Sequence, residues 1–302
     1  MDTRQLFQCF IAFCRRHGHS HHTIRAYEGD LNDFQKWLSS RPSQRLDGTV
    51  LEGWLREMRS RKYAPVTIKR KFATLKITFN WIEEHKNITE NPFHSFKLKI
   101  KLPQKLPMAL GRTELAALFR QAEQDAQNGA KLSKKTMWLA LELLFATGVR
   151  VGELCGITLQ DIDNNGEIIR VFGKGSRERQ VFIVDNNTLL LINNYIEFHP
   201  LYSNGTNTLL LTNRGSAATP DFIRRNLHNL AKRAQIKRRV TPHMLRHSSA
   251  TQLLERGVDI RYVQRLLGHS SISTTELYTL VSDSSLKSCL KNANPRARLN
   301  TR

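Results

Sequence analysis

The sequence predicts a mainly α-helical protein of two domains, with one small antiparallel sheet in the second domain. A length of 302 residues is enough for two separate hydrophobic cores. Apolar residues recur at helical spacing through the first hundred residues, whereas two short β-branched runs occur further along. A stretch rich in proline and lysine separates the two regions, which is typical of a linker.

Two amphipathic helices are predicted in the first domain, residues 1–96. Their apolar faces consist of Ile24, Tyr27, Leu31, Phe34 and Leu38 in one helix, and of Ile68, Phe72, Leu75, Phe79 and Ile82 in the other. Cations lie between the apolar residues of the second helix, at Lys69, Arg70, Lys71 and Lys76. They form either a solvated face or a face laid against phosphates, and the scarcity of acids nearby favours phosphates.

A basic linker is predicted over residues 97–112, ahead of the second domain at 113–302. From residue 91 onward the chain combines an Asn-Pro step, two more prolines and Gly111 without apolar periodicity. Lysines in this stretch are spaced so that they could follow a DNA backbone: Lys97, Lys99, Lys101 and Lys105. A new helix is expected to begin at Thr113.

The second domain is predicted to contain several helices and one β-hairpin. Helices are expected at 134–147, 187–198 and 220–235. The strands at 167–172 and 179–184 flank Gly-Lys-Gly-Ser-Arg-Glu, which has the chemistry of a hairpin turn. The segment 220–239, interpreted as helical, carries cations suited to groove or phosphate contact: Arg224, Arg225, Lys237, Arg238 and Arg239.

The composition indicates a polyanionic partner. The net charge is +21, which favours nucleic acid over the alternative of a generally basic protein. The four cysteines form no C-x-x-C pair and no zinc-ligand spacing, so free thiols in a reduced, cytosolic setting are expected. The first residues begin a helical pattern rather than a signal peptide, and no apolar run approaches the roughly 18 residues of a membrane span.

Residues that can carry chemistry gather between 241 and 278. Thr241 is a suitable N-cap and Pro242 suits the first position of a helix. His243 and Arg246 then share one helix face near the N-terminus, where N–H groups and partial positive charge favour a phosphate. Alone, this His-x-x-Arg pair is a weak signal, because most such pairs are solvated surface residues.

Two further residues of this segment follow predicted helix boundaries. His269 comes directly after Gly268, the expected stop of a helix at 259–267. The capping box at 273–276 starts another helix, and Tyr278 lies in its first turns. Taken singly, His269 is explained as a cation at a helix C-terminus, and Tyr278 as a half-buried packing residue.

Arg150 and Lys174 lie further upstream. Arg150 follows an apolar helix and an Ala-Thr-Gly turn, where a buried arginine needs an anion that Glu153 could supply structurally. Lys174 lies at the predicted hairpin tip, in Gly-Lys-Gly-Ser. This is not a nucleotide-binding loop, because the required Gly-x-x-x-x-Gly-Lys spacing places Ile168 where a glycine is needed.

In chain order, these residues resemble the catalytic set of the tyrosine recombinases, also called the phage integrase family. The set consists of Arg150, Lys174, His243, Arg246, His269 and Tyr278. The sequence motifs around these residues are similar as well: Ala-Thr-Gly-x-Arg-x-x-Glu-Leu, His-x-Leu-Arg-His-x-x-Ala-Thr, and Leu-Leu-Gly-His followed by tyrosine nine residues later. The first domain and basic linker resemble the family's four-helix, SAM-like core-binding domain, and the second its mixed α/β catalytic domain.

The resemblance implies a covalent mechanism. Tyr278 would attack the scissile phosphorus, forming a 3′-phosphotyrosine and releasing a 5′-hydroxyl. Arg150 and Arg246 would hold the non-bridging oxygens and stabilise the transition state.

The remaining roles implied by the resemblance concern protons and orientation. His243 would assist proton transfer at the tyrosine, His269 would donate a hydrogen bond to the phosphate, and Lys174 would protonate the leaving 5′ oxygen. Glu153 would orient Arg150 or His243. The phosphotyrosine conserves the bond energy, so no metal, ATP or other cofactor is expected.

The same resemblance implies a homotetramer on two double-stranded DNA sites, which exchanges strands through a Holliday junction, with an accessory protein as an option. Residues 283–292 would form a C-terminal helix that docks on a neighbouring protomer. Two alternatives are a type IB topoisomerase-like nicking-closing enzyme and a DNA-binding protein that has lost catalysis. A first domain that begins almost at residue 3 favours a simple Xer-like or mobile-element recombinase, acting at the bacterial nucleoid.

Overall fold

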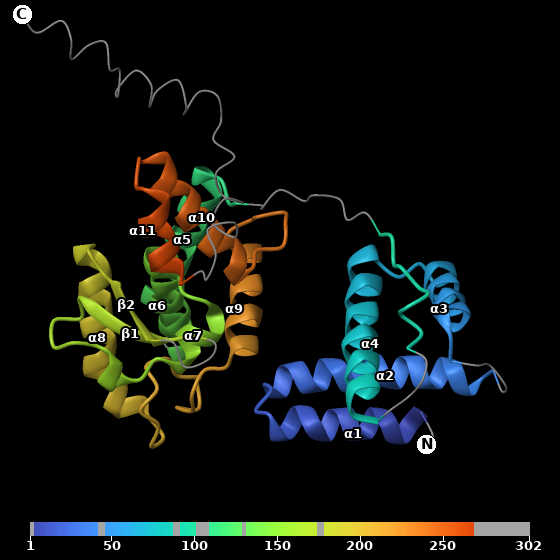
Figure 1. Ribbon diagram of the computed structural model, residues 1–302. Helices are drawn as coiled ribbons and strands as arrows, with labels where there is room; N and C mark the ends of the chain where they lie inside the picture. Colours follow the sequence, from blue (N-terminus) through green and yellow to red (C-terminus); the bar gives the residue numbers. More distant parts are fainter. Residues whose placement is uncertain are drawn as a thin grey trace, which may run out of the picture. The chain divides into compact units, whose positions relative to one another are not determined.

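The computed structural model describes residues 3–41, 46–86, 91–100, 109–128, 131–173 and 178–268. The chain divides into two compact units, residues 1–105 and 106–302. In its described residues the first unit has four helices and no strand, and the second unit combines helices with one two-stranded sheet (Figure 1). The predicted fold class is therefore confirmed. No helix in these ranges is both long and apolar enough to cross a bilayer.

The first unit is built around an aromatic core. Its helices are α1 (Thr3–Arg16), α2 (His21–Ser39), α3 (Gly48–Ser60) and α4 (Pro65–Lys86). Ser20 and Asp47 cap α2 and α3 by accepting hydrogen bonds from backbone N–H groups of the first turn. The predicted apolar face of α4 is buried, and so is that of α2 except for the half-buried Tyr27 and Leu38. The Phe34 and Trp54 rings meet edge to face at 4.9 Å between centroids.

The core of the first unit continues beyond residue 91, into the segment predicted to be extended. Phe96 is buried and stacks on Phe72 with 5.2 Å between ring centroids. Phe93, Leu98 and Ile100 pack against the same core. Part of the predicted linker therefore contributes apolar side chains to the first unit, as far as Ile100.

One cation of the predicted basic face on α4 points inward. Lys71 is 4% exposed, and its Nζ lies 3.2 Å from Asp30 Oδ1 and 2.5 Å from Asp33 Oδ2. Arg70 also donates to Asp30. The prediction that Lys71 lies on an outward basic face is therefore wrong, because α2 supplies two carboxylates from 38 and 41 residues earlier.

The second unit is organised around one central helix, α6 (Leu132–Thr147). The other helices are α5 (Arg112–Gln127), α7 (Val151–Gly156), η1 (Leu159–Asp161), α8 (Asn186–Tyr202), α9 (Pro220–Arg233), α10 (Pro242–Glu255) and α11 (Ile260–Leu267). α6 contacts α5, α7, α8, α9 and α10. Leu139, Leu141 and Leu144 are fully buried on different sides of it, as expected for a helix that is apolar all round.

The predicted hairpin is confirmed as an antiparallel pair. Its strands are β1 (Ile168–Phe172) and β2 (Glu178–Phe182), with Val171 opposite Arg179 and Ile169 opposite Val181. Residues directly opposite one another share a face of the sheet, so Arg179 points to the same side as three buried aliphatic side chains. Lys174, predicted at the hairpin tip, belongs to the segment between the two strands that lies outside the described residues.

Candidate active site

The site is centred on the turn after α6. Gly148 ends that helix in the left-handed conformation, with φ at 62°. A Cβ at this position would lie 2.6 Å from the Leu267 side chain, so glycine also permits a close approach of α11. Arg150 follows as the N-cap of α7. The predicted Ala-Thr-Gly turn therefore brings two elements that are distant in sequence together.

Glu153 anchors Arg150 at the start of α7. Its Oε2 accepts from the Arg150 backbone N–H at 2.8 Å, and its Oε1 from the Arg150 guanidinium at 2.7 Å. The sequence is compatible with Glu153 orienting either Arg150 or His243. In the structure its carboxylate is hydrogen-bonded to Arg150. The Arg150 side chain nevertheless remains 41% exposed, so this ion pair does not shield it from other anions.

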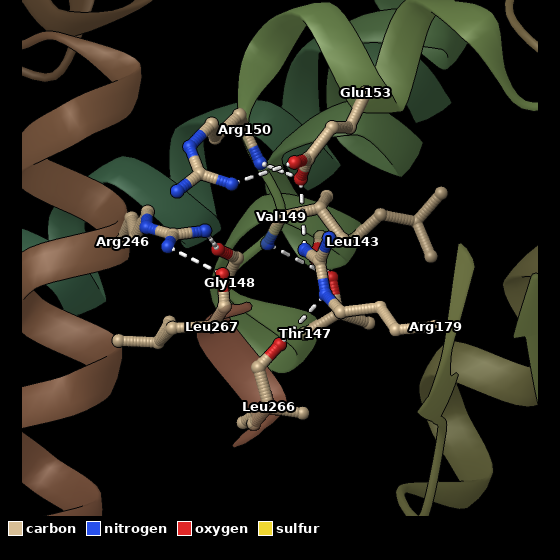
Figure 2. Close-up of polar contacts among 10 residues, drawn as sticks. All are labelled: Leu143, Thr147, Gly148, Val149, Arg150, Glu153, Arg179, Arg246, Leu266 and Leu267. Atoms are coloured by element: carbon tan, nitrogen blue, oxygen red, sulfur yellow. Dashed lines mark hydrogen bonds and ion pairs between the residues drawn. The ribbon is translucent and has the colours of Figure 1, made fainter. Parts of the chain in front are cut away.

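A second arginine shares the Glu153 carboxylate. Arg179 donates to Oε2 at 2.8 Å and, through Nε, to the Leu266 carbonyl at 3.0 Å (Figure 2). Burial raises the pKa of Glu153, but the hydrogen bonds from Arg179 and Arg150 outweigh burial and lower the pKa below its ordinary value. Glu153 is therefore ionised at neutral pH, although its side chain is only 6% exposed.

Arg246 joins the α6 turn to the end of α11. It is 4% exposed and donates to the carbonyl oxygens of Gly148 and Leu267, the latter at 2.6 Å (Figure 2). Arg246 lies on α10, whose predicted start is confirmed: Pro242 is the first residue and the Thr241 hydroxyl accepts from the Met244 N–H.

His243 lies on the first turn of α10 in a cationic environment. The residue as a whole is exposed, but its imidazole is partly desolvated by the protein, which lowers its pKa. The charges of Arg246, Arg224 and Arg150 lower the pKa further. The neutral imidazole is thus the favoured form at pH 7, and it can accept a proton. The structure also brings Arg224, predicted only as a DNA contact, into the electrostatic surroundings of the site.

The helix that precedes His269 has the predicted boundaries. Asp259 caps α11, and Gly268 ends it with φ at 64°. A Cβ on Gly268 would lie 3.1 Å from the Arg179 side chain. His269 and Tyr278, the 273–276 capping box and the 283–292 segment lie outside the described residues, as do Lys174, Lys101 and Lys105.

Arg179 is the residue of this network that the sequence reasoning missed. Its signal was present, since Arg179, Val181 and Ile183 alternate and the two aliphatic residues face the core. An arginine on the apolar face of a strand requires a buried anion, and Glu153 is that anion.

Most of the predicted DNA contacts in the described residues are exposed, but Lys71 and Arg238 are held in structural ion pairs. The exposed ones are Lys69, Arg70, Lys76, Lys99, Arg224, Arg225, Lys237 and Arg239. Arg238 is half-buried, and it donates to Glu114 at 2.8 Å and to the Ala109 carbonyl at 2.7 Å. α9 ends at Arg233, so the prediction that residues 237–239 continue this helix is wrong.

Within the described ranges, no three His, Cys, Asp or Glu side chains are grouped as a metal ion would require. Cys9, Cys14 and Cys155 are free thiols, as predicted, while Cys289 lies outside those ranges. Burial raises the pKa of Cys155 to about 11, which makes a thiolate nucleophile at this position unfavourable.

The sequence and both units match one protein family. Residues 110–285 match the phage integrase family, and residues 9–86 match the phage integrase N-terminal SAM-like domain. The tyrosine recombinase XerC of Myxococcus xanthus is 36% identical over 289 residues, covering 93% of this chain and 94% of the relative. That of Listeria innocua is 33% identical over 285 residues, covering 92% and 93%. The chain belongs to the phage integrase family, the tyrosine recombinases.

Solved structures with the same fold include two recombinases in complex with DNA. XerH bound to a palindromic difH substrate has a TM-score of 0.75 at 22% identity, covering 98% of this chain and 85% of that one. The Tn1549 transposon integrase with transposon right end DNA has a TM-score of 0.76 at 20% identity, covering 97% and 99%. With Xer-type relatives over most of its length, this chain is an enzyme of site-specific DNA recombination.

Proposed function

We propose that this recombinase binds a double-stranded DNA site, cleaves it through Tyr278 and exchanges strands with a second site through a Holliday junction. One observation carries the proposal. Arg246 is hydrogen-bonded to Gly148 in the turn and to Leu267 at the end of α11, while the side chain of Arg150, two residues after Gly148, is 41% exposed. Two guanidiniums held beside one turn suit the two non-bridging oxygens of a phosphodiester.

Cleavage proceeds as a transesterification. The phenol oxygen of Tyr278 bonds to phosphorus as the bond from phosphorus to the 5′ oxygen breaks, which leaves a 3′-phosphotyrosine. The phenol proton passes to His243, whose lowered pKa keeps the imidazole neutral and therefore available to accept a proton at pH 7. Lys174 donates a proton to the departing 5′ oxygen. His269 donates a hydrogen bond to the phosphate.

Each unit has its own role in the proposed function. Residues 1–96 act as the core-binding domain, residues 97–112 as the basic linker, and residues 113–302 as the catalytic domain. Four copies act on two DNA sites in the bacterial nucleoid, joined through residues 283–292. Deleting residues 283–302 should weaken synapsis of two sites more than binding to one, and unchanged tetramer formation would contradict this assembly.

A nicked suicide DNA tests the chemistry. The substrate carries a nick just beyond the scissile phosphate, so that cleavage releases a short strand and the covalent adduct accumulates. The unmodified enzyme should form an adduct that survives denaturation, and Tyr278→Phe should form none while still binding the site. An adduct of undiminished yield with Tyr278→Phe would remove Tyr278 as the nucleophile.

A further inference from the structure

Arg179 connects three parts of the candidate site. It belongs to β2, donates to Glu153 at the start of α7, and donates to the Leu266 carbonyl at the end of α11 (Figure 2). Its side chain also packs against Gly268. Only 14% of the side chain is exposed, so Arg179 does not offer a surface to DNA comparable with that of Arg150.

The charges around Glu153 are unequal. A single carboxylate, 6% exposed, lies between the guanidiniums of Arg150 and Arg179, and its two oxygens accept from both. If Arg150 were its sole partner, one negative charge would offset one positive charge. With Arg179 present, the group as a whole keeps one positive charge. That surplus is open to solvent on the Arg150 side, where 41% of the side chain is exposed.

We propose that Arg179 is a positioning residue for strand cleavage: its charge offsets that of Glu153, so that Arg150 retains its positive field for the scissile phosphate. The inference rests on the proposed function. The buried arginine acts through its neighbour, because its own bonds are made to protein groups at the base of the site. The bond to Leu266 has a second effect, since it fixes the end of α11 two residues before Gly268.

A purely structural role for Arg179 makes a different prediction. If Arg179 only held the fold together, then removing Glu153 as well would leave cleavage unchanged or slower, since a second bond network would be lost. If Arg179 offsets the charge of Glu153, then neutralising Glu153 should restore part of the lost rate. The isosteric Glu153→Gln supplies that neutralisation.

The experiment measures the single-turnover rate of adduct formation on the nicked suicide DNA, at saturating protein. Arg179→Met should slow cleavage about 100-fold, the size of effect that a misplaced or weakened catalytic group produces. Arg179→Met combined with Glu153→Gln should be faster than Arg179→Met by at least about tenfold, or 1.4 kcal/mol in the barrier. Arg179→Lys keeps the charge and should lie between the unmodified enzyme and Arg179→Met.

Arg170→Met is the matched control. Arg170 lies on the neighbouring strand, 48% exposed, and donates to the Gln160 carbonyl. Its replacement removes an arginine from the same hairpin but none from the Glu153 group, so the cleavage rate should stay at the unmodified level. Affinity for the uncleaved site and the melting temperature are measured for every variant. Should Arg179→Met fail to fold, the polar and uncharged Arg179→Gln and its combination with Glu153→Gln carry the test.

The outcomes separate this inference from the proposed function. No adduct with the unmodified enzyme would contradict the function itself. Normal adduct formation by both the unmodified enzyme and Arg179→Met would overturn only the role of Arg179. A double variant as slow as Arg179→Met, or an Arg179→Lys variant as slow as Arg179→Met, would assign Arg179 to the fold rather than to the charge of the site.

Discussion

Each unit of the molecule contains a buried carboxylate shared by two cations. In the first unit, Asp30 is 2% exposed and accepts from Arg70, Lys71 and Thr74. In the second unit, Glu153 accepts from Arg150 and Arg179. Both arrangements satisfy the carboxylate, and both link elements that are far apart in sequence.

The two groups differ in their charge balance. In the first unit a second carboxylate, Asp33, bonds Lys71, so two acids face two cations. In the second unit one acid faces two arginines, with Arg246 beside the same turn. A balanced group only holds helices together, whereas a group with surplus charge retains affinity for an external anion. The comparison therefore separates a structural ion network from a candidate active site.

The largest effect is expected from breaking the balanced group. Asp30→Ala leaves the buried Lys71 with one carboxylate instead of two, and should lower the free energy of unfolding by about 3–5 kcal/mol. Asp33→Ala is the control, because the Asp33 side chain is 51% exposed, and it should cost only about 1 kcal/mol. Urea unfolding of the full chain measures both. Equal small losses would show that Asp30 contributes no more than a surface ion pair.

A partly buried carboxylate that forms no ion pair with any described residue sharpens the comparison. Burial raises the pKa of Glu142, on α6, to about 7, with Asp185 and Glu123 adding to the rise and a hydrogen bond from Trp138 opposing it. The folded chain holds this proton more tightly than the unfolded chain. Glu142 therefore costs stability progressively as the pH rises from 4.5 towards 7, and the cost persists above that.

Glu142→Gln should remove that cost. At a pH of about 7.5 the variant should be more stable than the unmodified protein, by at most about 3 kcal/mol, and at about pH 5 the difference should be much smaller. Thermal unfolding at the two pH values measures the effect. A stability difference that does not change with pH would show that Glu142 has an ordinary pKa.

A smaller effect distinguishes cations that are paired from cations that face solvent. Lys237 is exposed, and if it contacts a phosphate, Lys237→Ala should reduce the slope of log affinity against log salt by about 0.9. Arg238 is bonded to Glu114, so Arg238→Ala should leave the slope unchanged and cost about 1 kcal/mol of stability. Identical slopes for Lys237→Ala and the unmodified protein would show that Lys237 does not contact DNA.

The smallest effect tests the surplus positive charge itself. Burial lowers the pKa of the half-buried His247, and His243 and Arg246 lower it further. Below about pH 6.5 the unfolded chain takes up a proton that the folded chain resists, so the stability decreases as the pH decreases. When the pH is lowered from about 7.5 to about 5.5, the melting temperature of His247→Gln should decrease by less than that of the unmodified protein. Equal losses would exclude this contribution.

Local signals in the sequence predicted the elements that carry the site. Thr241 with Pro242 marks the start of α10, and Gly268 marks the end of α11, because caps depend on residues a few positions apart. The hairpin and the apolar α6 were predictable for the same reason. The resemblance of the motifs to one family added the catalytic set, including members outside the described residues.

Long-range partners were not predictable from local patterns. Lys71 looks like a surface cation in the sequence, because Asp30 lies 41 residues away, and Arg238 is paired with Glu114 across 124 residues. Which of several lysines or arginines turns inward depends on how helices pack, and a single helical period does not contain that information. Phe93 and Phe96 were the overlooked signal against an extended chain after residue 91, since aromatic side chains favour burial.

The two glycines that end α6 and α11 limit how this enzyme can be retargeted in the laboratory. Gly148 and Gly268 adopt left-handed conformations, and a methyl group at either position would collide with Leu267 or crowd Arg179. A mutant library selected for a new DNA sequence should therefore keep glycine at both positions in every surviving clone. Useful diversity is better concentrated on the exposed cations Arg225, Lys237 and Arg239, where a change alters the surface without displacing the helix ends.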